Sequence, residues 1–248
     1  MNKELVAMKA LTMHSIRSTI MGKRVLIPLV MGVFLVIVMY NASRADPTMD
    51  GGVDLMGSLV ISLFAVLLAM IYGTGMINGD IEDGSIINVA TAPVNRGVIF
   101  MIYYLSAVIS FTFVMFILGT TAYLAYFFPA ELTWFRFDYL VSFMWLILLS
   151  GLVYSSLFVT LGLLVKKPLY IGLFYVFVWE GFVGQLAGRI GEISINHYIL
   201  SIGSHLFDHG ELSRYSGAGS GTSTLVLVLI WASLLALGAY LFVNREFS

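Results

Sequence analysis

The sequence predicts an all-α membrane protein that forms a single transmembrane domain over residues 1–248, with six membrane-spanning helices and both termini in the cytoplasm. Three observations predict this fold: the composition, six long apolar runs, and the distribution of Lys and Arg. Of the 248 residues, 59% are hydrophobic and 11% are charged, whereas ordinary soluble domains carry about a quarter charged residues. A soluble core of this size could not bury so much apolar surface, but a lipid bilayer is itself an apolar solvent.

Each of the six apolar runs approaches the roughly 20 residues that a helix needs to cross the hydrocarbon core. Helices are expected because the runs lack the alternation of a barrel strand, and a helix satisfies its own backbone hydrogen bonds in lipid. The runs are approximately 25–42, 55–77, 99–125, 139–165, 169–187 and 225–243. The fifth is the least regular, since glycines and polar residues interrupt its second half.

Lys and Arg are more numerous on the side of the predicted bundle that holds the N-terminus. That side carries nine basic residues and the opposite side carries four. Because cytoplasmic segments are enriched in Lys and Arg, both termini are expected in the cytoplasm. The nine are Lys3, Lys9, Arg17, Lys23, Arg24, Arg96, Lys166, Lys167 and Arg245, and the four are Arg44, Arg136, Arg189 and Arg214.

Residues 3–22, before the first span, show an apolar stripe at helical spacing. Val6, Met13, Ile16 and Ile20 fall near one face of a helix, and most of the basic residues fall elsewhere. This pattern favours an amphipathic helix lying in the inner membrane interface. The alternative is a basic tail that only charge holds near anionic lipid.

The loop between the second and third spans, residues 78–97, has the pattern of a short cytoplasmic helix framed by stop signals. Gly84 permits a sharp turn, and Ser85 or Asp83 can cap the N–H groups that open a helix. Ile86 begins a small apolar patch, and Pro93 discourages the helix from continuing. A short helix with an exposed apolar patch suits docking onto another protein.

This loop resembles the first-inner-loop signature of ABC-2-type transporter permeases, the membrane subunits of type V-like ATP-binding cassette exporters. The sequence departs from the usual signature at Asp80, where Glu is common, and at Ser85, where Thr is common, and both changes keep the charge or the capping group. The resemblance covers the whole chain in its arrangement of spans, but only the loop is motif-specific. The matching residues are Asp80, Glu82, Gly84, Ser85, Ile86, Val89, Pro93 and Arg96.

The resemblance implies a division of labour between subunits. Two permease chains, identical or different, would pack together in a prokaryotic plasma membrane, and each loop would dock onto a cytoplasmic ATP-binding subunit that holds ATP and Mg²⁺. In agreement, the sequence contains no Gly-x-x-x-x-Gly-Lys-Ser/Thr phosphate-binding loop, so this chain is not expected to be an enzyme. The residues that the resemblance assigns to coupling with the ATPase are Asp80, Glu82, Gly84, Ser85, Ile86, Pro93 and Arg96.

Two other classes of function are weighed against this one. A secondary transporter or channel subunit would work without ATP, and typically carries several intramembrane charges or an internal repeat. An intramembrane hydrolase would need a Ser nucleophile and a His base at membrane depth, whereas the four His residues lie outside the predicted spans. The net charge of −1 indicates no nucleic-acid partner.

Glu180 is the clear ionisable residue at membrane depth, about a dozen residues into the fifth run. A carboxylate there must be protonated, paired or facing a wet cavity. It is predicted either to line or gate the substrate path, or to be a structural residue that joins two helices by hydrogen bonds. In the resembled family this helix is commonly broken near its outer end, which Gly181 and Gly184 would permit.

Residues 188–224 are expected to form an extracytoplasmic segment, re-entrant or interfacial in its first part and a Gly/Ser-rich loop in its second. His205 and His209 lie four residues apart and are candidates to bind a metal from one helical face, against a default of polar residues at a wet surface. On the second span, the small residues Ala65 and Gly73 belong to a stripe that allows close packing, with contacts inside the chain favoured over a dimer seam.

Overall fold

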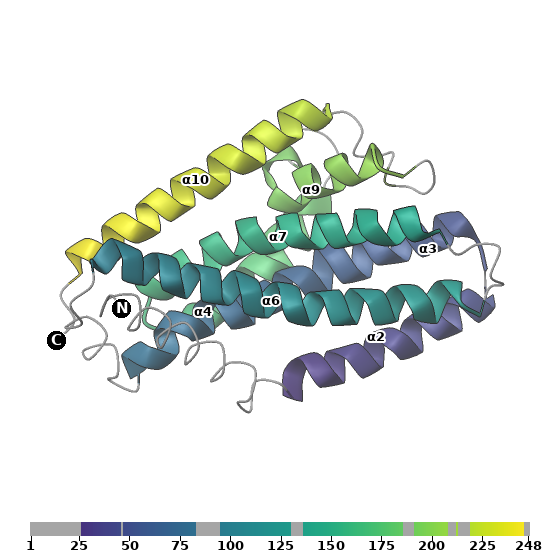
Figure 1. The fold of residues 1–248 in the computed structure, drawn as a ribbon, viewed down its shortest axis with the longest axis horizontal. Coiled ribbons are helices and arrows are strands. Elements are labelled where there is room, and N and C mark those ends of the chain that lie inside the picture. The colour runs from purple at the N-terminus through teal and green to yellow at the C-terminus, as the bar shows by residue number, and fades with distance from the viewer. Residues whose placement is uncertain are drawn as a thin grey trace, which may run out of the picture.

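The computed structural model describes residues 26–45, 47–82, 95–129, 136–185, 191–207, 212 and 219–245. All regular structure in these ranges is helical, which confirms the predicted all-α class (Figure 1). Five helical segments are long and apolar enough to cross a membrane. They are Leu26–Ala45, Met49–Ile81, Arg96–Phe127, Phe137–Leu164 and Ser220–Asn244.

The first, third, fourth and last of these segments are single α-helices. They match the predicted runs 25–42, 99–125, 139–165 and 225–243 to within a few residues. The helices are α2 (Leu26–Ala45), α6 (Arg96–Phe127), α7 (Phe137–Leu164) and α10 (Ser220–Asn244).

The second segment is built from three helical pieces and begins earlier than the predicted run at 55–77. Helix α3 (Met49–Leu55) starts at the N-cap Thr48, whose hydroxyl accepts a hydrogen bond from the Gly51 N–H at 3.2 Å. It continues as the ten-residue π-helix η2 (Met56–Ala65) and then as α4 (Val66–Glu82). π-Helices are rare and often lie at functional sites.

The fifth apolar run forms only a short helix. Helix α8 (Pro168–Phe174) continues as the π-helix η4 (Tyr175–Glu180), and the helix ends at Gly181. These 13 residues, Pro168–Glu180, reach about 20 Å, short of the roughly 30 Å of a bilayer core. The predicted run 169–187 is therefore not one continuous helix, and the break falls at Gly181, one of the glycines that were expected to permit it.

Beyond the break, the chain returns into the bundle through two single-turn 3₁₀ helices, η5 (Val183–Gln185) and η6 (Gly191–Ile193). It then forms α9 (Ile195–Ser204), which packs against α7, α10 and η2. Most residues of α9 are buried, so the first part of the predicted 188–224 segment is a packed helix.

Helices α4, α6 and α7 form the centre of the bundle, with α2 packed on α6 and α10 packed on α7, α9 and α6 (Figure 1). Close packing depends on glycine where α4 meets α7. A Cβ atom added at Gly73 would lie 2.7 Å from the Phe158 Cβ. Gly73 is thus at a helix contact inside the chain, as the small-residue stripe on the second span predicted.

The two ends of the bundle are named here after arginines. At the Arg96 end, α6 begins and α7 and α10 end, since the Arg245 guanidinium contacts the Leu163 carbonyl. At the Arg136 end, α2 and α6 end together, because the Ser43 hydroxyl donates to the Tyr126 carbonyl at 2.6 Å. Helices α7 and α10 therefore run in the same direction.

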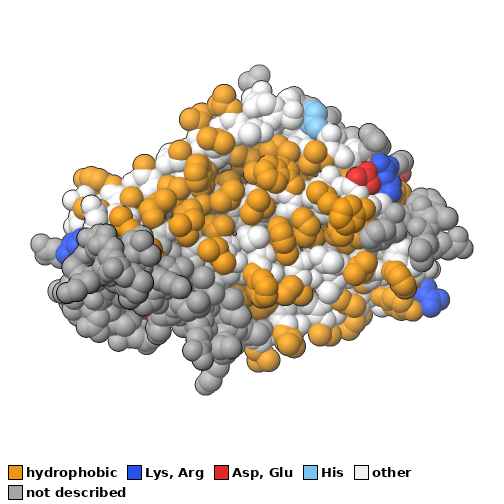
Figure 2. Space-filling model, viewed as in Figure 1, with side chains coloured by type: hydrophobic (Ala, Val, Ile, Leu, Met, Phe, Trp, Pro, Cys, Tyr) orange, Lys and Arg blue, Asp and Glu red, His pale blue; other side chains and the backbone are white. Residues whose placement is uncertain are grey.

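The outer surface of the bundle is apolar. Figure 2 shows hydrophobic side chains along the length of one face, with the charged side chains near its two ends. In the most apolar stretches of α2 and α10, only 22% of residues are buried inside the chain. Large hydrophobic residues are exposed on α2, α8, η4 and α10, among them Leu29, Phe34, Tyr170, Phe177, Leu229 and Tyr240. Such a surface suits lipid or a partner helix rather than water.

Candidate functional site

Glu180, the last residue of η4, is a carboxylate buried inside the bundle with 2% of its surface exposed. The Tyr175 hydroxyl donates to its Oε1 at 2.6 Å. The Ser194 hydroxyl and the Asn196 backbone N–H donate to its Oε2, the latter at 3.4 Å. A buried carboxylate is costly unless it is hydrogen-bonded, and these three donors supply that compensation.

The π-helical geometry of η4 is what pairs Tyr175 with Glu180. The two residues lie five positions apart, which in an α-helix places them about 140° apart around the axis. The wider π turn brings positions i and i+5 together. The same separation recurs in η2, where the Ser62 hydroxyl donates to the Gly57 carbonyl at 2.9 Å.

Ser194 connects the carboxylate to the start of α9. It is the N-cap of α9, and its hydroxyl oxygen accepts from the His197 N–H at 3.4 Å while its hydrogen goes to Glu180. Negative charge is favourable at a helix N-terminus, so the carboxylate and α9 stabilise one another. Gly184 leaves room for the contact between Ser194 and Glu180, because a Cβ at position 184 would lie 3.0 Å from the Ser194 hydroxyl oxygen.

Asn196 extends the network to the second membrane segment. Its side-chain amide donates to the Ser62 hydroxyl of η2 at 2.8 Å. Ser62, Tyr175, Glu180, Ser194 and Asn196 are together called the Glu180 cluster below. The cluster therefore joins both π-helices to the beginning of α9.

Two buried polar atoms, the Asn196 side-chain oxygen in the cluster and the Tyr154 hydroxyl beside it, have no hydrogen bond from the described residues. Tyr154, on α7, is fully buried and lies near the Glu180 carboxylate. Unsatisfied buried groups are uncommon.

The sequence singled out Glu180 but none of its partners. Tyr175 carries no signal, because its spacing to Glu180 fits no α-helical pair. Ser194 precedes an apolar stretch and could have been recognised as an N-cap. The structure places Glu180 among hydrogen-bond donors, and its role in a substrate path or gate stays a prediction.

The residues assigned to coupling are only partly within the described ranges. Gly84, Ser85, Ile86 and Pro93 lie outside them. Glu82 is the last residue of α4, and its side chain also lies outside the described part.

The two flanks of that loop, Asp80 and Arg96, contact the bundle. The Asp80 carboxylate accepts a hydrogen bond from the Tyr103 hydroxyl of α6 at 2.5 Å. The Arg96 guanidinium donates to the Val243 carbonyl at 3.2 Å and to the Arg245 carbonyl at 3.4 Å. Arg96 thus caps the exposed carbonyls at the end of α10, where a cation is favourable.

The candidate metal ligands do not form a site in the described part of the chain. His209 lies outside it, and the described residues contain no group of three or more His, Cys, Asp or Glu that could hold a metal ion. The His205 Nδ1 lies 2.8 Å from the Ser201 carbonyl and 3.3 Å from the Ser204 hydroxyl. Since a carbonyl only accepts, Nδ1 carries the hydrogen and cannot act as a base toward Ser204.

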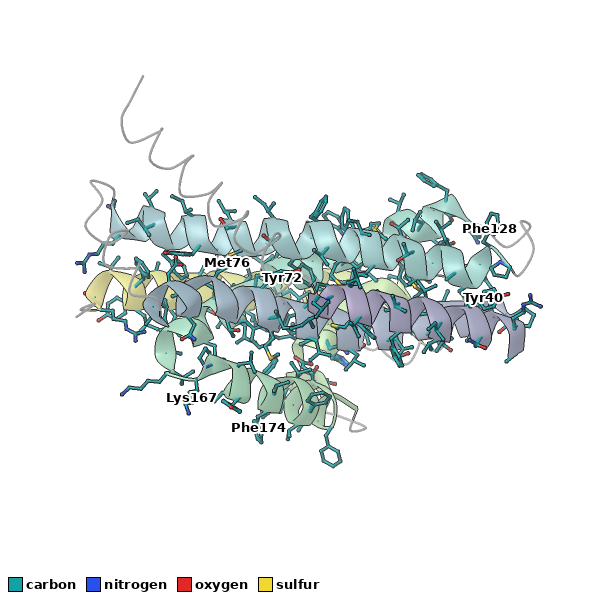
Figure 3. The ribbon with its side chains drawn as sticks, turned by 90° about the horizontal axis from the view of Figure 1, so that it is seen from below. Tyr40, Tyr72, Met76, Phe128, Lys167 and Phe174 are labelled. Atoms are coloured by element: carbon teal, nitrogen blue, oxygen red, sulfur yellow. The ribbon has the colours of Figure 1, made fainter. Side chains whose placement is uncertain are left out.

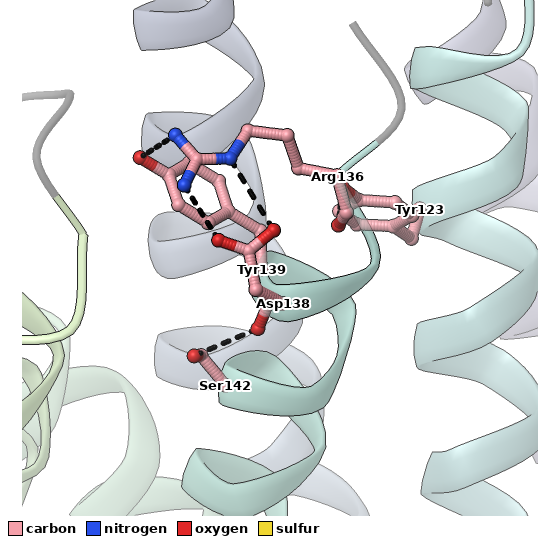
Figure 4. A network of polar contacts seen from close by, with 5 residues as sticks. All are labelled: Tyr123, Arg136, Asp138, Tyr139 and Ser142. Carbon is pink, nitrogen blue, oxygen red and sulfur yellow. Dashed lines mark hydrogen bonds and ion pairs between the residues drawn. The ribbon is translucent and has the colours of Figure 1, made fainter.

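A second polar network lies at the Arg136 end (Figure 4). The Arg136 guanidinium pairs with the Asp138 carboxylate at 2.6 Å and stacks over the Tyr139 ring at 4.2 Å. The Tyr123 hydroxyl donates to the Arg136 carbonyl at 2.8 Å. This network joins the end of α6 to the start of α7, and both charged side chains are partly exposed, so it contains no buried charge.

Comparisons with protein-family models and with curated proteins find no match to this chain.

Proposed function

We propose that this chain is the membrane-spanning permease subunit of an ATP-driven exporter of the ABC-2 type. It would act with a separate cytoplasmic ATP-binding subunit, which holds ATP and Mg²⁺, and with a second permease chain in a prokaryotic plasma membrane. The observation that carries the proposal is the pattern from Asp80 to Arg96 between the second and third membrane segments. No catalytic residue is assigned to this chain.

The contacts at the two flanks of that loop support a coupling role. Asp80 ties the end of α4 to α6 through Tyr103, and Arg96 ties the start of α6 to the end of α10. Arg245 in turn contacts the Leu163 carbonyl at the end of α7. A displacement of the loop would therefore act on four helices at once.

The direction of the helices supports six crossings with both termini on one side. Helices α7 and α10 run in the same direction, so the chain between them must travel the length of the bundle. The described part of that path consists of α8, η4, the two 3₁₀ turns and α9. We propose that it forms a broken sixth crossing, and that the excess of Lys and Arg places the Arg96 end in the cytoplasm.

Within this proposal, the Glu180 cluster is the joint of the broken crossing. Its hydrogen bonds hold the end of η4 against the start of α9 and against η2. A tilt of α8 relative to α4 would have to change these bonds. Glu180 would then contribute to gating by its position, whether or not it contacts substrate.

Co-purification tests the proposal. An ATPase with a phosphate-binding loop, sought first in the neighbouring reading frame, should purify with this chain and show transport-coupled hydrolysis. Glu82→Ala and Arg96→Ala should each reduce the recovered ATPase, or the stimulation of its activity, several-fold. Arg136→Ala is the matched control, because Arg136 makes comparable polar contacts at the opposite end. Transport by the purified chain without any ATPase partner would contradict the proposal.

The buried carboxylate favours a second candidate, a secondary transporter that works without ATP. Such proteins place ionisable residues and broken helices at membrane depth, as Glu180 and the break at Gly181 do here. Transport driven by an ion gradient in vesicles that contain this chain alone would support this candidate. Glu180→Gln should then abolish the ion coupling.

A further inference from the structure

A pocket of about 390 Å³ lies between the start of α2, the Arg96-end half of α4 and the start of α8. It shares no lining residue with the Glu180 cluster. In the view of Figure 3, α8 stands out from one side of the bundle and Lys167 lies at its beginning. The pocket therefore sits beside the beginning of an apolar helix, near one end of the membrane segments.

The pocket has two kinds of wall. Ile27, Ile71 and Leu169 form an apolar wall, and Ile27 and Leu169 are also exposed on the outer surface. Thr74, Asn78 and Lys167 form a polar wall. An occupant with both a charged and an apolar part would match this lining better than a wholly apolar chain or a soluble ion.

Lys167 carries the only charge among the described residues that line the pocket. Within the described ranges no carboxylate pairs with it, and its ammonium lies 6.0 Å from the Tyr170 ring centroid. An ammonium group offers three donors and no acceptor. The complementary group is therefore an anion that accepts hydrogen bonds, such as a phosphate.

We propose that this pocket binds the headgroup of an anionic phospholipid, with Lys167 paired to the phosphate. The pocket volume of about 390 Å³ falls within the roughly 300–1,000 Å³ of small-molecule sites, which leaves room for a glycerophosphate headgroup. The acyl chains would leave past Ile27 and Leu169 onto the apolar exterior. Basic pockets between membrane helices at the headgroup level are suited to this class of ligand.

Lipid binding to the full-length chain in detergent tests the proposal, with phosphatidylglycerol as the probe, phosphatidylcholine as its zwitterionic counterpart and soluble glycerol phosphate as the free anion. Lys167→Gln should weaken phosphatidylglycerol binding about fivefold. Lys166→Gln is the matched control, because this neighbouring exposed lysine does not line the pocket. At about 0.5 M salt the screening length falls to roughly 4 Å. The loss of binding in Lys167→Gln should persist, because Lys167 would contact the phosphate directly. Any loss in Lys166→Gln should vanish, because it would come from attraction over a longer distance.

Each alternative result is decisive. If both lysine variants lost phosphatidylglycerol binding equally, or if both losses vanished in salt, the lipid would be held by general surface attraction. Either result would overturn the proposal. Equal binding of phosphatidylglycerol and phosphatidylcholine would show that the pocket does not select an anionic headgroup, and would overturn the proposal. If glycerol phosphate bound as tightly as the lipid, the ligand would be a free anion and the proposal of a lipid site would be overturned. Unfolding midpoints of both variants should equal that of the unsubstituted chain, because neither lysine side chain is buried.

Discussion

Replacing Gly73 by Ala should force α4 and α7 apart. The added Cβ would lie 2.7 Å from the Phe158 Cβ and 3.3 Å from the Phe158 carbonyl carbon and the Val159 nitrogen. Carbon atoms in contact normally lie about 3.5–4.0 Å apart, so the helices must separate by about 1 Å. Side-chain rotation cannot relieve the clash, because these neighbours are a Cβ and backbone atoms.

Gly162→Ala is the matched control at the same helix contact. Its Cβ would lie 3.5 Å or more from the Thr74 backbone, which is an ordinary contact. Both substitutions gain up to about 1 kcal/mol of helix propensity. Overpacking costs about 1–3 kcal/mol, and only the Gly73 variant incurs it. The difference between the two variants therefore isolates the clash.

The assay is thermal unfolding of the purified chain in detergent. For a chain of this size, about 1 kcal/mol corresponds to about 2–4 °C in the midpoint. Gly73→Ala should therefore unfold several degrees below Gly162→Ala, which should match or exceed the unsubstituted chain. Equal midpoints for the two variants would refute the close α4–α7 packing derived from the structure.

Two further predictions concern the polar networks. Glu180→Ala leaves two hydroxyl donors, one of them partly buried, and one N–H without their acceptor, at about 1–3 kcal/mol for each buried group that finds no other partner. Amide exchange in α9 should therefore accelerate by at least tenfold. Glu180→Gln keeps one acceptor oxygen and should show a smaller change. Similar exchange in both variants and in the unsubstituted chain would mean that Glu180 does not hold α9. Asp138→Asn removes the ion pair with Arg136, but both side chains are exposed, so the unfolding midpoint should not change measurably; a clear drop would show that this pair is more important than its exposure indicates.

The long spans could be predicted because lipid demands a simple pattern. A run of about 20 apolar residues can satisfy its backbone only as a helix, so α2, α6, α7 and α10 follow from composition alone. The fifth run was harder. Apolar composition extends to Val183, but the helix ends at Gly181, where the carboxylate of Glu180 meets the start of α9.

The contacts of single residues were less predictable than the spans. Arg96 could be assigned from the sequence to the side of the bundle that holds the N-terminus, but its contact with the end of α10 joins residues almost 150 positions apart. Ser62 and Asn196 are 134 positions apart. Neither pairing has a local pattern, because both arise only once the helices have packed.

The π-helix η2 also affects how related sequences should be aligned. A π turn holds more residues than an α turn, so a residue can be gained or lost there without displacing the helices on either side. A relative with one residue fewer between Met56 and Ala65 would form an ordinary α-helix, and its equivalent of Ser62 would turn away from Asn196. An alignment gap in this segment therefore marks relatives in which the hydrogen bond between η2 and α9 is absent, and a polar residue at position 196 would have no partner there.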